Sequence, residues 1–179
     1  MAEPARLETA APPARPQAAV LRRRMLSAWQ MRSFMLAKLP LALVAGLRVR
    51  ELDERRCAVS VPYGWRTTNP FRSTYFAAQS MAAEMSTGAL AMLAVELAPA
   101  PVAMLITGLS ATFEKKATAL AIFTCDQGDT VFAAVAETVR TGEPATATVE
   151  TVGRMADGTV VARFAFTWSF KRRSGQRSA

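Results

Sequence analysis

The sequence of 179 residues predicts one α+β domain in which a mainly antiparallel sheet covers a single long helix. Residues 73–98 contain no proline, and Glu84 and Glu96 are their only charged side chains, so they predict a helix that is apolar on nearly every side. Apolar and polar residues alternate elsewhere, most clearly over residues 159–170, and this period of two predicts strands. A sheet curved around the helix is the simplest arrangement that buries both.

Strands and turns follow from the same alternation. Six strands are predicted, over residues 43–52, 56–63, 104–115, 117–124, 144–154 and 159–170. The first two strands form a hairpin around the polar segment 52–55, and the last two turn at Asp157 and Gly158. Residues 64–72 predict a loop with a turn at Asn69 and Pro70, which leads into the long helix.

Two further helices complete the pattern. Residues 20–39 predict an amphipathic helix that stops at Pro40. Valines at i, i+4 and i+8 within residues 129–141 predict a short helix, with Asp129 as its N-cap and Gly142 as its C-cap. The domain is therefore expected over residues 20–171. It lies between an alanine- and proline-rich disordered tail at 1–19 and a basic tail at 172–179.

Composition excludes several kinds of chemistry. The chain has no histidine, so histidine-dependent catalytic triads and dyads cannot form within it. Cys57 and Cys125 lie far apart in sequence without a CxxC spacing, which argues against a metal site and favours a reducing, cytoplasmic location. No glycine-rich phosphate loop is present. Neither a metal nor a cofactor is expected.

The charge pattern bears on partners. The formal net charge is +8, with basic residues gathered in the first 73 residues and at the C-terminus, around an acidic middle. Few aromatic residues separate the basic ones, so a nucleic-acid partner is not expected, and a surface that attracts anionic ligands is preferred. The longest clean apolar run, residues 39–47, is too short to span a membrane, and no membrane partner is expected.

Glu84 is the most informative residue. A carboxylate within an apolar, buried helix is costly unless it is paired, hydrogen-bonded or protonated, and such groups often belong to functional sites. The alternative is a structural role in which Glu84 bonds a neighbouring hydroxyl. Ser80, Thr87 and Gly88 lie on the same helical face, where they form a pocket wall or only satisfy and pack against Glu84.

The loop and helix at residues 69–88, NPFRSTYFAAQSMAAEMSTG, resemble the DUF4442 group of hotdog proteins, which is related to PaaI-like thioesterases. SATFEKKA at residues 110–117 and the final strand VVARFAFTWSFKR support the resemblance, which covers about residues 26–171. It implies a hotdog fold: a curved, mainly antiparallel sheet wrapped round the long central helix, here with an added N-terminal helix. It also implies a homodimer or tetramer acting on acyl-CoA or another acyl thioester.

The resemblance also implies site residues. In PaaI-like enzymes an Asn in the loop precedes a His-Gly-Gly entry to the helix, and an acid follows within the helix. Asn69 matches the Asn and Glu84 the acid, while Tyr75, Phe76 and Ala77 stand at the His-Gly-Gly positions. Glu84 then resembles the general base or nucleophile, Asn69 a residue that orients water or the carbonyl, and the Ala77 N–H an oxyanion donor.

Some of these positions have alternative interpretations. Tyr75 either donates a hydrogen bond to substrate or belongs to the core, and Phe76 lies at the substrate entry. Lys115 and Lys116 either meet CoA phosphates or are solvated charges at a strand end. The side chains of Phe76 and Ala77 could crowd a thioester where glycine would not. The sequence therefore predicts an acyl-CoA thioesterase-like hydrolase, with a non-catalytic acyl-thioester or fatty-acyl binding protein as the alternative.

Overall fold

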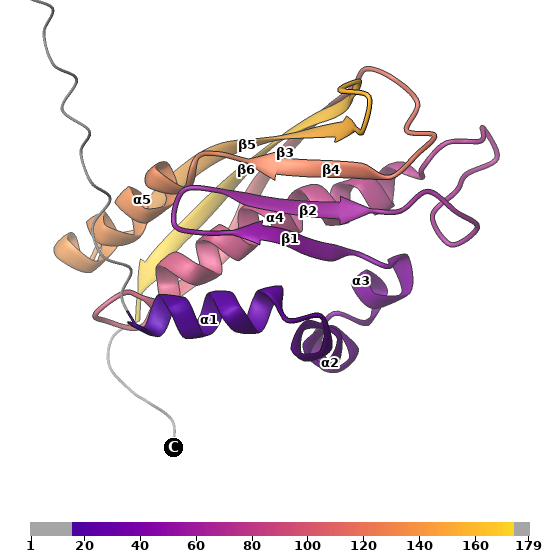
Figure 1. Cartoon of the computed structure of the whole chain (residues 1–179). Coiled ribbons are helices and arrows are strands. Elements are labelled where there is room, and N and C mark those ends of the chain that lie inside the picture. The colour runs from indigo at the N-terminus through magenta and orange to yellow at the C-terminus, as the bar shows by residue number, and fades with distance from the viewer. Residues whose placement is uncertain (1–15, 174–179) are drawn as a thin grey trace, which may run out of the picture.

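A computed structural model describes residues 16–173, which form a curved sheet with helices against it (Figure 1). The elements in chain order are α1 (Pro16–Leu26), α2 (Ala28–Lys38), α3 (Pro40–Ala45), β1 (Arg48–Leu52), β2 (Cys57–Val61), α4 (Phe76–Glu96), β3 (Val102–Phe113), β4 (Ala121–Cys125), α5 (Gly128–Thr141), β5 (Ala145–Met155) and β6 (Val160–Arg172). The predicted α+β order is confirmed.

All pairings in the six-stranded sheet are antiparallel, in the order β1-β2-β4-β5-β6-β3. Helix α4 runs along the inside of the curve and packs on β2, β4 and β5, and helices α1 to α3 lie beside β1 and α4 (Figure 1). Strands β1 and β3 form the two edges of the sheet. None of the described helices is long and apolar enough to cross a membrane.

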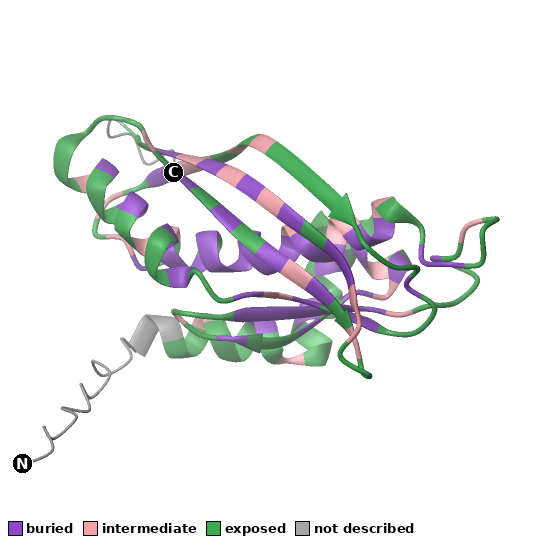
Figure 2. Cartoon of the chain, turned by 90° about the horizontal axis from the view of Figure 1, so that it is seen from above, coloured by how far each residue is buried: buried purple, intermediate pink, exposed green. Residues whose placement is uncertain are grey.

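The core lies between α4 and the sheet. Leu90 and Leu93 of α4 have no exposed surface, and Phe164, Phe166 and Phe170 of β6 are almost fully buried. These phenylalanines share one face of β6, as the alternation predicts. Thirteen of the 21 residues of α4 are buried (Figure 2), because the sheet covers it on several sides. The long central helix is confirmed.

The N-terminal region differs from the prediction. The single helix expected over residues 20–39 is two helices that begin at Pro16 and break at Ser27, whose backbone is extended. The break lets both helices direct methionines into the core, including Met25 and Met31. The two expected tails lie outside the described residues at positions 1–15 and 174–179.

The strand expected over residues 43–52 was also wrong in its first half. Pro40 starts the short helix α3, Gly46 ends it at φ 75°, and β1 begins only at Arg48. A proline suits the first turn of a helix, and a glycine suits the left-handed residue after the last.

The cap of α5 is a second correction. Gln127, not Asp129, is the N-cap, and Asp129 lies within the first turn. The N–H of Gly128 donates to the Arg55 carbonyl, and a Cβ at Gly128 would collide with the Glu54 backbone. Contact with the β1–β2 turn therefore sets where α5 begins. Gly142 is the left-handed C-cap, as predicted.

Candidate functional site

A cavity of about 560 Å³ lies where the loop after β2 meets the start of α4 and the end of β3. Asn69 shapes its loop side. The Asn69 Oδ1 accepts hydrogen bonds from the N–H groups of Phe71 (3.0 Å) and Ser73 (3.2 Å) and from the Ser73 hydroxyl (3.2 Å). The Asn69 NH₂ group has no partner among the described residues, so it can donate to a ligand.

Tyr75 and Phe76 form an aromatic wall of this cavity together with Phe113 of β3. The rings of Tyr75 and Phe76 meet edge to face at 4.8 Å between centroids, and those of Phe76 and Phe113 at 6.4 Å. Tyr75 and Phe76 keep 47% and 54% of their surface exposed, so the alternative that Tyr75 is a core residue was wrong. The wall offers an apolar contact surface at the helix entry.

The lysine pair has two different environments. The Lys116 Nζ donates to the Phe71 carbonyl (3.2 Å), which ties the end of β3 to the loop. The Lys115 side chain is exposed and has no partner among the described residues. Both lysines line the same cavity as Asn69. They therefore place positive charge at its rim.

The sequence interpretation missed Gln79, which also lines this cavity. Gln79 is 5% exposed; its Nε2 donates to the Thr74 carbonyl (3.0 Å), and its Oε1 has no partner. A buried acceptor without a donor costs about 1–3 kcal/mol, so a ligand donor there would be favoured. The available signal was an amide one turn after Tyr75 in an otherwise apolar helix.

The start of α4 supplies backbone donors. Tyr75 is its N-cap and makes no side-chain capping bond. The Ala77 N–H lies in the first turn, where no intrahelical acceptor exists, and no other described residue accepts from it. Unpaired N–H groups and the helix dipole together favour a negatively charged ligand atom at this end.

Glu84 lies farther along α4 and is half-buried. Its carboxylate has no hydrogen bond or ion pair with any residue in 16–173. Burial raises the pKa of Glu84 above its ordinary value, because the charged form loses solvation without gaining a partner. A half-buried carboxylate without a partner and with a raised pKa is a candidate general base.

The neighbours of Glu84 leave its carboxylate free. The Ser80 hydroxyl donates to the Phe76 carbonyl (2.9 Å), and the Thr87 hydroxyl donates to the Glu84 main-chain carbonyl (3.0 Å). The Trp168 Nε1 donates to the Thr87 Oγ1 (3.1 Å) and so fixes the indole beside the helix. The alternative in which Ser80 and Thr87 satisfy the Glu84 carboxylate was therefore wrong.

Because Gly88 has no side chain, the Glu84 carboxylate and the Trp168 ring can both lie close against the helix there. A Cβ at this position would lie 3.0 Å from the Glu84 Oε1 and 3.3 Å from the Trp168 Cζ2. Any larger residue would press on the carboxylate. Trp168 was another residue that the sequence interpretation did not connect with Glu84, because it comes from β6 at the other end of the chain.

The structure thus divides the expected site residues into two groups. One group surrounds the cavity: Asn69, Tyr75, Phe76, Lys115 and Lys116, with Ala77 at the adjoining helix start. The other group is Glu84 with Ser80, Thr87 and Gly88. Glu84 comes seven positions after Ala77, which corresponds to a rise of about 10 Å along the helix axis. The two groups therefore lie about two helical turns apart within one chain, and Glu84 does not line the cavity.

The family model of DUF4442, a domain of unknown function, matches residues 27–170. The chain belongs to the DUF4442 family. No curated protein sequence matches it significantly.

Solved structures resemble this DUF4442 chain at low sequence identity. A protein of unknown function and probable thioesterase from Pseudomonas aeruginosa has 18% identity and a TM-score of 0.69, over 84% of this chain and 99% of that one. A thioesterase from Haemophilus influenzae has 8% identity and a TM-score of 0.60, over 88% and 99%. The Escherichia coli PaaI protein from the phenylacetic acid degradation operon has 16% identity and a TM-score of 0.56, over 87% and 98%. With the curved sheet around α4, these similarities show the hotdog fold.

The thiols are poor nucleophiles. Cys57 and Cys125 face each other across β2 and β4, and both are free and buried. Burial raises the pKa of both thiols, that of Cys125 to about 11, so little thiolate forms at neutral pH. Among residues 16–173 no cluster of three or more acidic or cysteine side chains could hold a metal ion.

Proposed function

We propose that this protein hydrolyses acyl thioesters, with acyl-CoA as the substrate class, at a site shared between two copies of the chain. The observation that carries the proposal is the half-buried Glu84 carboxylate, which has no partner among the described residues and lies close to Gly88. The fold is that of proteins described as thioesterases, which supports the reaction class without establishing it.

The proposed reaction uses water as the nucleophile. Glu84 takes a proton from water, and the hydroxide oxygen attacks the thioester carbonyl carbon. The Ala77 N–H and the Asn69 NH₂ donate to the oxygen that becomes negative. The tetrahedral intermediate then breaks its C–S bond, releasing a carboxylic acid and a thiolate that takes up the proton. Lys115 and Lys116 lie at the cavity rim, where phosphates of CoA would be attracted.

A homodimer would bring the two groups of residues together. Strand β3 is a sheet edge with exposed apolar side chains, including Leu105 (68%) and Leu109 (56%), and Figure 2 displays its exposed C-terminal half. Long apolar edges are normally paired or covered, and pairing β3 with its symmetry mate would satisfy both edges. In such a dimer Asn69 and Ala77 of one chain would face the second chain's Glu84.

A binding protein without catalysis is the second candidate. The Phe76 side chain is 54% exposed at the helix entry and packs edge to face on Tyr75 and Phe113. A side chain there narrows the approach of a thioester to the Ala77 N–H. Under this candidate the cavity holds an acyl thioester in place, and no thiol is released.

One experiment separates the two candidates. A panel of acyl-CoAs is incubated with wild-type protein and with Glu84→Gln, and released thiol is followed by a colorimetric reagent. The hydrolase predicts turnover by the wild type and a loss of about two orders of magnitude or more in Glu84→Gln. Calorimetric binding of acyl-CoA without thiol release would establish the second candidate. Wild-type turnover by a folded Glu84→Gln protein would refute the role of Glu84.

The same proposal includes a cytoplasmic location, where CoA esters and reduced thiols occur. Cys57 and Cys125 are register partners on neighbouring strands and remain free thiols, which supports a reducing compartment.

A further inference from the structure

Helices α1 to α3 present an unusually apolar surface to solvent. Eight large apolar side chains on these helices and the residue between α2 and α3 are exposed: Val20, Leu26, Trp29 (79%), Phe34, Leu36 (68%), Leu39, Leu41 (71%) and Val44. We call this surface the N-terminal face. Contiguous exposed apolar surface of this kind usually marks an interaction site.

The N-terminal face is also basic. Arg22, Arg23, Arg24, Arg32 and Lys38 are all exposed, and none of them forms an ion pair within residues 16–173. Residues 9–50 contain neither Asp nor Glu. The positive charge of these helices is therefore uncompensated locally.

Helix α2 has a buried side and an exposed side. Met31 and Met35 are buried against the body of the protein. Trp29, Arg32 and Leu36, spaced i, i+3 and i+7, share the side of the helix away from these methionines and are exposed. Helix α3 repeats the arrangement on a smaller scale, with Leu41 and Val44 exposed at i and i+3. Tryptophan and leucine beside cations are typical of helices that lie in a membrane interface.

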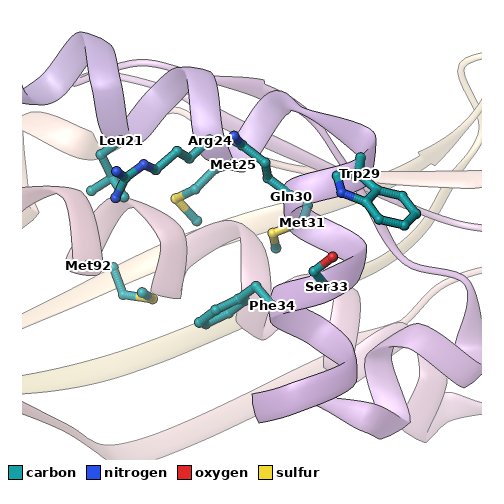
Figure 3. Close-up of a pocket in the computed structure, with 9 residues that line it drawn as sticks. All are labelled: Leu21, Arg24, Met25, Trp29, Gln30, Met31, Ser33, Phe34 and Met92. Atoms are coloured by element: carbon teal, nitrogen blue, oxygen red, sulfur yellow. The ribbon is translucent and has the colours of Figure 1, made fainter.

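An apolar groove of about 560 Å³ lies between α1, α2 and Met92 of α4 (Figure 3), with Trp29 at its edge. Its interior is lined by Leu21, Met25, Met31 and Phe34, and Arg24 lies on its α1 side. Methionine side chains adapt to irregular apolar ligands. The groove can accommodate an apolar chain, with Arg24 available to an anionic headgroup.

We propose that the N-terminal face docks on a bilayer containing anionic phospholipids. Charge complementarity selects this occupant. A second copy of the chain would bring these basic helices against each other across a two-fold axis without any acid of residues 16–50 to compensate, which is unfavourable. An anionic bilayer instead offers negative headgroups to the cations and an apolar interior to Trp29 and Leu36. The helices would lie on the membrane without spanning it, so this proposal revises the sequence-based expectation that the chain has no membrane partner.

This inference does not depend on the proposed reaction. Helix α1 packs beside β1, at the sheet edge opposite β3, so docking would leave the proposed dimer edge free. The cavity at the start of α4 shares no residue with the groove of Figure 3. Membrane docking and thioester hydrolysis can therefore be tested separately.

The test is sedimentation of the full chain with vesicles. One set contains phosphatidylcholine with roughly 30% phosphatidylglycerol, which gives the negative surface potential that attracts polybasic surfaces. The other set contains phosphatidylcholine alone. The wild type should bind the anionic vesicles at least tenfold more tightly, and binding should weaken in high salt. Fluorescence from Trp29 should shift to shorter wavelength on binding, and this shift should survive in a Trp65→Phe protein.

Two pairs of variants make the test specific. Arg32→Glu/Lys38→Glu should lose affinity by roughly 25-fold or more, because each cation near an anionic surface contributes about fivefold. Arg140→Glu/Arg154→Glu changes the net charge equally on α5 and β5, where both arginines are exposed, and should bind almost as the wild type does. Trp29→Ala/Leu36→Ala should lose roughly tenfold or more, whereas Trp65→Ala, which removes an 86% exposed indole from a loop, should not.

Circular dichroism confirms that each variant is folded. Equal binding to neutral and anionic vesicles, or equal losses in the test and control pairs, would overturn the proposal. So would an absence of vesicle binding by the wild type. If light scattering then showed that Trp29→Ala/Leu36→Ala changes the number of chains in the particle, the N-terminal face would be an interface between copies instead.

Discussion

Replacing Gly88 with alanine adds one methyl group next to the Glu84 carboxylate. The new Cβ would lie 3.0 Å from the Glu84 Oε1, and 3.3 Å and 3.4 Å from two carbons of the Trp168 ring. Ordinary contacts begin at 3.4 Å, so the main conflict is with the carboxylate, by a few tenths of an ångström. Trp168 is 4% exposed and held by its bond to Thr87, whereas the carboxylate ends a flexible side chain. The carboxylate is therefore the group that moves.

The expected effects on stability and activity differ. Alanine is favoured over glycine inside a helix by about 1 kcal/mol, and overpacking costs about 1–3 kcal/mol where neighbours cannot yield. Because one neighbour yields, the free energy of unfolding should change by no more than about 1 kcal/mol, or roughly 2–4 °C in Tm. A base displaced by a fraction of an ångström to 1 Å should lower kcat roughly 10- to 100-fold, with a smaller change in KM.

The assay is thiol release from the best acyl-CoA of the panel, with Tm from scanning calorimetry. Gly64→Ala is the matched control, because a Cβ there meets nothing within 4 Å and no positive φ is required. Gly64→Ala should keep wild-type kcat. If Glu84→Gln is inactive but Gly88→Ala keeps the wild-type kcat, the absence of a side chain at position 88 does not position the carboxylate.

Two other predictions follow from burial and from the sheet edge. Burial raises the pKa of Glu84 in the folded state above the ordinary 4.5, so the folded protein binds more protons and ionisation destabilises it as pH rises through that range. Glu84→Gln should therefore raise Tm at pH 8, and the gain should shrink at pH 4; a larger gain at pH 4 would contradict the assigned cause. Leu109→Glu on the β3 edge should convert a dimer into monomers by light scattering and abolish turnover. Leu41→Glu, at a leucine on α3 that is 71% exposed against 56% for Leu109, should leave the dimer intact; dimers of both proteins would refute pairing through β3.

The elements predicted best are those in which the sequence pattern continues over the most residues. Helix α4 was predicted over residues 73–98 and runs over Phe76–Glu96, because nothing in its composition favours another structure. Strand β6 was predicted from its alternation over residues 159–170, and it begins one residue later and ends two residues later. Its phenylalanines face the core on one side, as a period of two requires.

Short apolar segments were predicted less well. Residues 43–47 were assigned to a strand but belong to the end of α3 and the turn after it. Five or six residues contain too few repeats of the apolar pattern to distinguish a strand period of two from a helix period of 3.6. Pro40 and Gly46 were the better signals, since they mark the start and end of a short helix.

The sequence by itself determined the fold class and identified Glu84 as an unusual charged residue within an apolar helix. Both depend on local composition: a long apolar helix needs a covering sheet, and one charge within it stands out. It also nominated ten site residues, and the expectation that a dimer brings the loop of one chain against the Glu84 helix of the other stays a prediction.

Only the tertiary structure decided the surroundings of that charge. Trp168 reaches Thr87 across 81 positions of sequence, because the curvature of the sheet brings β6 beside α4. The same packing leaves no room for a side chain at Gly88 and gives the Glu84 carboxylate no partner among the described residues. It also places Glu84 outside the cavity at Asn69 and leaves the Gln79 Oε1 without a donor. These properties arise from distances between residues remote in the chain, and local periodicity carries no information about such distances.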